Sequence, residues 1–203
     1  VWLNLPKVSK MVDPHFKMLW NEDIPVISHK DESNKTTTVE VIAGKIDTTT
    51  ALDPTPDSWA ANQKNSVGVY TVKMEAGANW TLPKTSNEAN RSVFFYKGST
   101  INLEGQTISA NHVLELEAGE NIAFQNGNEE AYFLILEGKP IGEPVAQHGP
   151  FVMNTQEEIR EAMSDYGKTQ FGGWPWTEKE VVHSSKKGRF ALHSDGRKEI
   201  KNT

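Results

Sequence analysis

Histidine is the residue type in this chain best suited to acid–base chemistry or metal binding. Six are present: His15, His29, His112, His148, His183 and His193. A protein metal site needs several imidazole or carboxylate ligands close together, so its usual sign is a short motif such as His-Xaa-His. Neither that motif nor His-Xaa-Xaa-Glu-His occurs. The spacing predicts no metal site in this chain, and it favours a structural or interface role for His148 beside the Gly149-Pro150 turn.

Other common catalytic signatures are also missing from the sequence. It contains no phosphate-binding glycine loop, nucleophile elbow or dinucleotide fingerprint. Cysteine is absent, which excludes disulfides, thiolate ligands and cysteine nucleophiles. The acidic pairs Glu129-Glu130 and Glu157-Glu158 fall at a turn and at a helix start, where solvation and the helix dipole account for them. We therefore predict no catalytic residue in this chain.

Trp174 and Trp176 are weak candidates for ligand binding. Two tryptophans one residue apart could form a stacking platform for a sugar or a base. The alternative is that the rings anchor an aromatic loop by packing, which is the more frequent use of large aromatic side chains.

Composition limits the partners that this chain could have. There are 21 Lys plus Arg against 27 Asp plus Glu, the net charge is −6 and the isoelectric point is about 5.6. This balance argues against general binding to nucleic acid or to a membrane surface. The last twenty residues are locally basic, but acidic residues dilute that charge. No apolar run approaches the roughly 20 residues of a membrane span, and no signal peptide is present, so a cytoplasmic location is expected.

Short apolar segments separated by turn residues fill the middle of the chain. Eight strands are predicted over residues 39–46, 67–74, 92–96, 100–103, 106–108, 112–116, 121–125 and 131–136. The connections leave no room for crossover helices, so an antiparallel barrel or sandwich is expected. The long segment Asp47–Ser58 is unusual in a compact domain and is interpreted as a functional or family-specific insertion.

The stretch from Gln147 to Thr155 combines a Gly-Pro turn, three apolar residues and a helix start, which is typical of a docking segment. Thr155 to Glu158 form a capping box, and a helix is expected over about 156–166, with Gly167 as its stop. We divide the chain into an extended linker (1–37), a β-barrel (38–142) and a C-terminal arm (143–203).

One run of residues also resembles a known family. Glu143 to Thr155, followed by Glu157-Glu158-Ile159, closely resembles the signature of the pirin family. Further similar segments occur in the family order: Val1-Trp2-Leu3-Asn4-Leu5-Pro6, Glu22-Asp23-Ile24-Pro25, Leu136 to Ile141, Phe171 to Trp176, and Gly188 to Ala191.

The resemblance implies an all-β, antiparallel cupin-type β-barrel (jelly roll) with a short C-terminal α-helix and an extended tail. Pirins are two-barrel proteins in which three His and one Glu of the N-terminal cupin hold iron. Those motifs precede the run that here begins at Val1. Between Gly77 and Gly98, where a cupin would place its ligands, this chain has Trp80, Pro83 and Asn90. No cofactor is expected in this chain, and iron is expected in an N-terminal cupin of the parent protein.

The resemblance leads to a functional hypothesis for the intact parent, an iron-dependent cupin with quercetin 2,3-dioxygenase-like activity. This half would be structural or regulatory, without its own active site. The alternatives are a protein-interaction module of the transcriptional-cofactor type and a carbohydrate-binding β-domain. The expected partners are the N-terminal cupin of the same protein or, by self-association, a second copy of this chain. The predicted interface residues are Trp2, Asn4, Phe16, Gln147, His148, Phe151, Met153 and Asn154.

Overall fold

The computed structural model describes residues 1–174, 176–177 and 184–201 and contains two compact units. The first unit comprises Val1–Asn4 and Asn21–Ile141, and the second comprises Leu5–Trp20 and Gly142–Thr203. The segment expected to be a linker, residues 1–37, is therefore shared between the two units. Residues 5–20 form one compact unit with the C-terminal arm, whereas residues 21–37 belong to the barrel.

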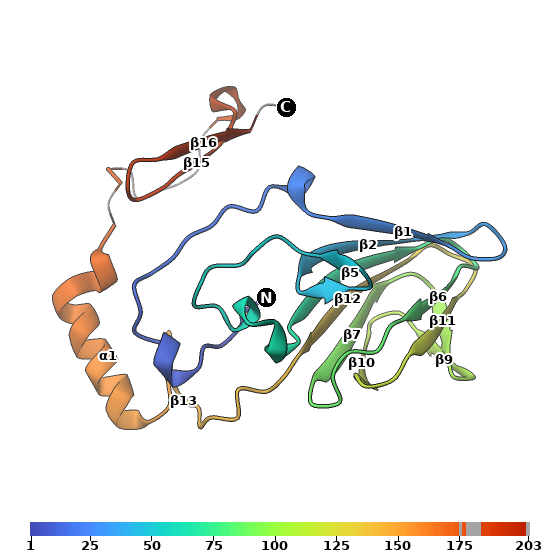
Figure 1. Ribbon diagram of the computed structural model, residues 1–203, viewed down its shortest axis with the longest axis horizontal. Coiled ribbons are helices and arrows are strands. Elements are labelled where there is room, and N and C mark those ends of the chain that lie inside the picture. The colour runs from blue at the N-terminus through green and yellow to red at the C-terminus, as the bar shows by residue number, and fades with distance from the viewer. Residues whose placement is uncertain (175, 178–183, 202–203) are drawn as a thin grey trace. The chain divides into compact units, whose positions relative to one another are not determined.

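Two antiparallel sheets build the first unit (Figure 1). The larger sheet has the order β1-β2-β5-β12-β7-β10, with these bounds: β1 Val26–Lys30, β2 Thr36–Ala43, β5 Gly68–Met74, β12 Ala131–Gly138, β7 Asn90–Lys97 and β10 His112–Glu117. The smaller sheet has the order β6-β11-β8-β9, with these bounds: β6 Asn79–Leu82, β11 Ile122–Asn126, β8 Thr100–Leu103 and β9 Gln106–Ser109. Every neighbouring pair in both sheets is antiparallel.

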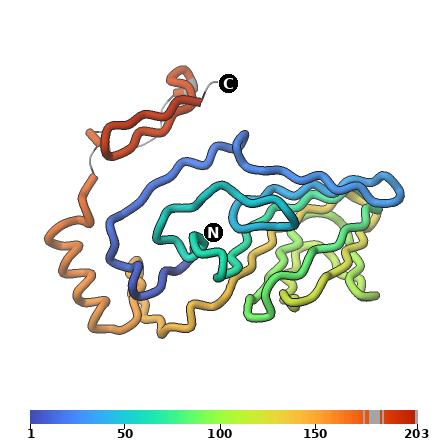
Figure 2. Tube along the Cα trace, in the orientation of Figure 1, coloured from blue at the N-terminus to red at the C-terminus, as the bar shows by residue number. Residues whose placement is uncertain are grey.

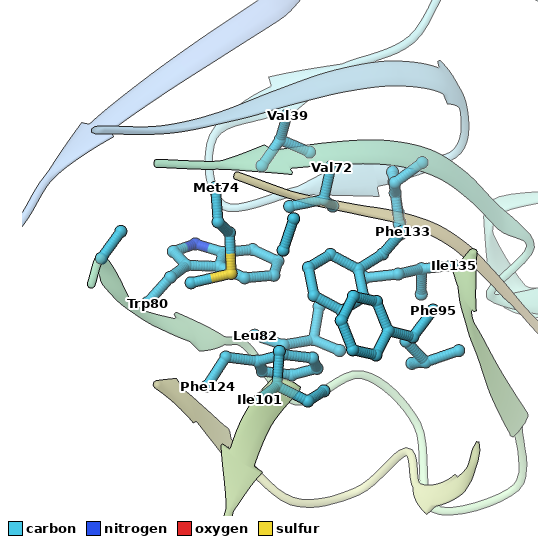
Figure 3. Packing of buried hydrophobic residues seen from close by; sticks show 14 of the residues in the cluster. Val39, Val72, Met74, Trp80, Leu82, Phe95, Ile101, Phe124, Phe133 and Ile135 are labelled. Atoms are coloured by element: carbon cyan, nitrogen blue, oxygen red, sulfur yellow. The ribbon is translucent and has the colours of Figure 1, made fainter. Parts of the chain in front are cut away.

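The hydrophobic core lies between these two sheets. Alternate residues of each strand point inward, so that Val72 and Met74 of β5 are fully buried while Lys73 between them is exposed. Figure 3 shows side chains from both sheets meeting in the core, among them Phe133 from the larger sheet and Phe124 from the smaller one. Their rings pack edge to face, 5.7 Å between centroids. This burial accounts for the regular alternation in the sequence.

All eight predicted strands are present, and the predicted all-β antiparallel fold is confirmed. Two strands of the barrel were not predicted. Strand β1 lies at the edge of the larger sheet, where it pairs with β2. It alternates between exposed and half-buried positions, so its sequence is too polar to be recognised as a strand. Strand β6 has only four residues, which is too short for a periodic pattern.

Short elements surround the barrel. They are β3 Lys45–Ile46, β4 Thr49–Thr50, and the 3-10 turns η2 Asn21–Asp23, η3 Trp59–Ala61 and η4 Gln63–Asn65. Strands β3 and β4 pair with each other. The segment Asp47–Ser58, expected to be an insertion, therefore begins as part of a small hairpin and then leads into η3.

The second unit begins with η1 Lys7–Ser9 and continues with a small hairpin and a helix. Strands β13 (Ala146–His148) and β14 (Phe151–Met153) pair across the Gly149-Pro150 turn, and the peptide bond between these two residues is cis. Helix α1 (Gln156–Thr169) follows directly and packs against the hairpin. After η5 (Gln170–Gly172) and η6 (Ser185–Lys187), strands β15 (Arg189–Leu192) and β16 (Lys198–Lys201) form a second hairpin, red in Figure 2.

Three features of this unit differ from the expectation. Residues 151–153 form a strand rather than an apolar patch outside any strand. Helix α1 runs to Thr169, beyond the expected stop at Gly167, and Gln170 in the left-handed conformation ends it. The spacing of Ile159, Ala162, Met163 and Tyr166 predicts one buried apolar stripe on the helix, but Met163 and Tyr166 are exposed and only Ile159 and Ala162 of these four are buried. None of the helices within the described residues has the length and apolar composition needed to cross a membrane.

Candidate functional site

A pocket of about 390 Å³ opens in the first unit. The chain from Gly44 to Asp47 and residues 50–54 form part of its wall. Residues 82–85, at the end of β6 and just beyond it, form another part, and Tyr70 and Glu137 line it from β5 and β12. The segment interpreted as a functional insertion thus contributes directly to a pocket. That position is compatible with the interpretation.

Two of these lining residues, Tyr70 and Glu137, form a buried polar network with Arg91, which is not part of the lining. Glu137 Oε2 accepts a hydrogen bond from Arg91 Nε at 2.8 Å, and its Oε1 lies 3.2 Å from the Tyr70 hydroxyl. The Tyr70 hydroxyl also lies 2.9 Å from the carbonyl oxygen of Lys45. The side chains of Arg91 and Glu137 are only 1% and 4% exposed, so this is a buried ion pair.

Arg91 has hydrogen-bond partners in addition to the Glu137 carboxylate. Its Nη2 donates to the carbonyl oxygen of Pro83 at 2.8 Å, and its Nη1 donates to that of Glu120 at 3.3 Å. A buried charge is tolerated only when it is paired and hydrogen-bonded. Arg91 meets this condition while joining β7 to two loops of the barrel.

Strand register explains why these residues meet. Glu137 on β12 stands opposite Arg91 on β7 and opposite Gly68 on β5. Tyr70 lies two residues beyond Gly68, on the same face of β5. A Cβ atom at Gly68 would collide with the Tyr70 hydroxyl and with the side chain of Glu137, so glycine leaves the space that the network fills.

Burial sets the protonation behaviour of this network. Burial raises the pKa of the Glu137 carboxyl, although the charge and hydrogen bond of Arg91 act in the opposite direction. The pKa of Tyr70 is also raised, first by burial and then by the negative charge of Glu137. Tyr70 therefore remains a protonated phenol at neutral pH.

The histidines are dispersed over both units. Nε2 of His29 lies 3.7 Å from Oδ2 of Asp47, and Nδ1 of His112 lies 3.0 Å from the carbonyl oxygen of Ser109. His193 is buried, with Nε2 2.7 Å from Oε1 of Glu199. His15 and His148 are exposed, and His183 lies outside the described residues. Within residues 1–174, 176–177 and 184–201, no three His, Asp or Glu side chains are grouped so that they could hold a metal ion.

The predicted interface residues fall in both units. Trp2 and Asn4 belong to the first, and Trp2 is largely exposed. The others belong to the second: Phe16, Gln147, His148, Phe151, Met153 and Asn154. Gln147 and His148 are exposed, whereas Phe151 and Met153 are half-buried.

Part of this set already has neighbours within the second unit. Asn154 is buried, and its Nδ2 donates to Oε2 of Glu143 at 2.8 Å. The Phe151 ring packs against Tyr166, 5.8 Å between centroids, and Phe16 packs against His193 at 5.2 Å. These residues therefore stabilise the unit itself, and their role toward another molecule stays a prediction.

Trp174 and Trp176 lie close together, with ring centroids 4.6 Å apart at an interplanar angle of 64°. An edge-to-face pair does not present two parallel faces for a planar ligand. This geometry is typical of two aromatic rings that pack against each other.

Sequence reasoning missed Tyr70, Arg91 and Glu137. Arg91 precedes the apolar run 92–96, and Glu137 follows the run 131–136, so each had been treated as a strand boundary. The sequence signal that could have identified Arg91 is its spacing, because it lies two and four residues before Val93 and Phe95, which are buried on the same face of the strand. A charged residue on the inward face of a strand indicates a buried pair.

Two antiparallel sheets packed around one core, with a pocket bordered by strands of the barrel, define a cupin-type β-barrel. The chain belongs to the pirin family, because the model of the Pirin C-terminal cupin domain matches residues 69–172. The fold agrees with the crystal structure of quercetin 2,3-dioxygenase from Acinetobacter baumannii. That structure superposes with a TM-score of 0.68 at 29% identity, covering 85% of this chain and 56% of that one.

Related sequences lead to the same family. Pirin-1 of Arabidopsis thaliana is 33% identical over 178 residues, which cover 85% of this chain and 57% of that protein. Human Pirin is 30% identical over 184 residues, covering 85% of this chain and 56% of that protein. The chain thus spans just over half the length of the curated relatives it matches.

The resemblance expects Trp80, Pro83 and Asn90 where a cupin would place its metal ligands, and the structure shows the surroundings of these three residues. Trp80 is buried in the core, 5.7 Å from the Phe124 ring. Pro83 borders the pocket and offers its carbonyl oxygen to Arg91, and Asn90 is exposed at the start of β7. Indole, proline and an exposed amide are not a ligand set for iron.

Proposed function

We propose that this chain is the C-terminal half of a two-cupin protein whose other half carries out a quercetin 2,3-dioxygenase-like oxygenation. In this proposal the N-terminal cupin holds the iron, and the present half stabilises that cupin without catalysing the reaction. The observation that carries the proposal is the match to an A. baumannii quercetin 2,3-dioxygenase over 85% of this chain but only 56% of that enzyme.

The chemistry of the described residues supports this division of roles. The positions that would supply metal ligands in a catalytic cupin hold Trp80, Pro83 and Asn90, and a buried ion pair lies beside them. Arg91 and Glu137 neutralise each other and, together with Tyr70, connect three strands, as expected of a structural network. Iron would supply the dioxygen chemistry, and its ligands would come from the other cupin.

The proposed docking surface lies in the second unit, around the β13–β14 hairpin and helix α1. Gln147 and His148 are exposed there, and the Phe151 side chain is half-buried beside Tyr166. A mixture of exposed polar groups and half-buried aromatic rings is typical of a protein interface. The N-terminal cupin of the same protein is the proposed partner.

Co-expression tests the proposal. This chain would be produced alone and together with a tagged N-terminal half of the A. baumannii enzyme, with quercetin consumption measured after loading with Fe²⁺. The expected result is capture of this chain by the tagged half and iron-dependent consumption of quercetin by the pair only. Quercetin turnover by this chain alone would contradict the proposal, and so would failure of the two halves to associate.

The same experiment separates the alternatives. A chain that is captured but adds no activity beyond that of the N-terminal half alone would favour an interaction module. A variant carrying His148→Ala and Phe151→Ala should weaken capture. The matched control, Tyr96→Ala on the barrel, should leave capture unchanged. Tyr96 suits this control because it is half exposed on β7 of the first unit.

A further inference from the structure

The pocket beside Tyr70 and Glu137 contains hydrogen-bond capacity that the protein does not use. An ionised carboxylate has about four acceptor positions. Within the described residues, Glu137 accepts from Arg91 Nε on one oxygen and lies within reach of the Tyr70 hydroxyl on the other. The Tyr70 hydroxyl carries one hydrogen, and it has two acceptors to share it between, Glu137 and the Lys45 carbonyl. A donor entering the pocket would find an acceptor at Glu137.

The charges around the pocket cancel. Its lining includes two lysines, Lys45 and Lys84, and two aspartates, Asp47 and Asp53. The remaining charge, that of Glu137, is balanced by Arg91 directly behind it. A charged ligand would lose hydration without a matching opposite charge, so an uncharged ligand is favoured.

The rest of the wall is mixed. The apolar residues Ile46, Leu52, Pro54, Val67 and Leu82 line the pocket together with Thr50, Gln63, Ser66 and Thr85. Its volume of about 390 Å³ lies at the lower end of the roughly 300–1,000 Å³ typical of small-molecule sites. Apolar wall residues beside a buried carboxylate acceptor suit a ring that carries a hydroxyl.

We propose that this pocket binds a neutral, hydroxyl-bearing small molecule whose hydroxyl donates to Glu137 and whose ring packs against the apolar wall residues. The site belongs to this half alone, and the proposal does not depend on the oxygenase activity proposed above.

Phenol is a suitable probe, with anisole and benzoate as matched compounds. Anisole has the same ring without a donor, and benzoate has the ring with a negative charge. The ¹⁵N-labelled full chain would be titrated with each compound. Phenol should shift the amide signals of residues 44–54 and 66–70. Phenol should bind about tenfold more tightly than either compound, because anisole cannot donate a hydrogen bond to Glu137 and benzoate brings a negative charge that the pocket does not balance. Equal affinities for phenol and anisole, equal affinities for phenol and benzoate, or phenol shifts confined to other residues would overturn the proposal.

Variants locate the site independently of the probe. Ala60 lines the pocket, and Ala60→Leu would fill it without touching Glu137, so phenol affinity should fall at least about tenfold. Ala123→Leu, on the exposed face of β11, is the matched control and should leave the affinity unchanged. Glu137→Gln should weaken phenol selectively over anisole. If it does not fold, the Ala60 comparison decides alone, and unchanged phenol binding in Ala60→Leu would refute the site.

Discussion

At the scale of single residues, the pair formed by Arg91 and Glu137 determines much of what this barrel can do. The ion pair occupies the inner faces of β7 and β12, where a barrel otherwise carries apolar side chains. Replacing such a pair with apolar residues is often neutral for stability, but removing one partner leaves an uncompensated buried charge. The consequence can be tested directly.

Arg91→Met should destabilise the chain by about 3–5 kcal/mol at neutral pH, because Glu137 is left buried without a counter-charge. The loss should shrink toward pH 4.5. Removing Arg91 raises the pKa of Glu137 further, and a protonated Glu137 no longer needs a partner. Urea denaturation at pH 7 and pH 4.5 measures both effects.

The exposed pair Arg160–Glu157 provides the control for this prediction. Its side chains are 67% and 71% exposed, so Arg160→Met should destabilise the chain far less than Arg91→Met. The double variant Arg91→Met with Glu137→Leu should recover most of the lost stability. Equal effects of Arg91→Met and Arg160→Met would show that the buried pair is not the structural link described here.

This pair also marks how far the sequence could predict the site. The absence of a His-Xaa-His motif is visible in the sequence, and the expectation that this chain holds no metal stays a prediction. The network of Tyr70, Arg91 and Glu137 was not predicted, because its three members are far apart in the chain. Only the register of β5, β12 and β7 brings them together, and strand register is set by the whole sheet.

At the scale of elements, helix α1 connects the two ends of the chain within the second unit. Glu158 accepts from the backbone amides of Asn154 and Thr155 on Oε2, and its Oε1 lies 2.6 Å from Lys7 Nζ. The capping box that the sequence predicted is present. Its additional contact with Lys7 depends on residues 5–20 packing with the arm, which local sequence signals do not encode.

The pKa of Glu158 is lowered, first by its hydrogen bond with Lys7 and then by that with the Asn154 amide. A carboxyl whose pKa is lower in the folded than in the unfolded state stabilises the fold above its unfolded pKa, near 4.5. This stabilisation should be lost as the pH falls through the lower folded value. Glu158→Gln should therefore reduce the difference in stability between pH 7 and pH 3, as measured by circular dichroism at 222 nm during denaturation. Asp165→Asn, exposed on the same helix, is the control; a pH profile of Glu158→Gln identical to that of the unmodified chain would contradict the assignment.

Gly167 gives a second prediction for this helix. Sequence reasoning treated it as a stop, but it lies inside α1 without positive φ, and no atom would obstruct an added Cβ. Because glycine costs about 0.5–1 kcal/mol relative to alanine within a helix, Gly167→Ala should stabilise the second unit by up to that amount. Thermal denaturation measures the change. A lower melting temperature would mean that the last helical turn is not formed in solution.

At the scale of the whole molecule, the strand pattern predicted the barrel well because each strand alternates in phase with one shared core. The division of the chain was harder to predict, because residues 5–20 form a compact unit with an arm that begins more than 120 residues later. Lys7 and Glu143 illustrate this long-range pairing, with the Lys7 amide donating to Oε2 of Glu143 at 2.7 Å. Composition and local periodicity carry no information about such contacts.

The metal content of the purified chain follows from this organisation. We predict that the chain, after incubation with Fe²⁺ or Zn²⁺ and desalting, retains far less than one metal ion per molecule, because Trp80, Pro83 and Asn90 stand where a cupin would place its ligands. Elemental analysis by mass spectrometry measures the content, and the two-cupin enzyme of A. baumannii, treated in parallel, provides the comparison. About one metal ion per chain would contradict the division of roles between the two cupins. A His29→Ala variant would then test the imidazole–carboxylate pair of the barrel, His29 and Asp47, as its binding site, because His29 lies beside Trp80.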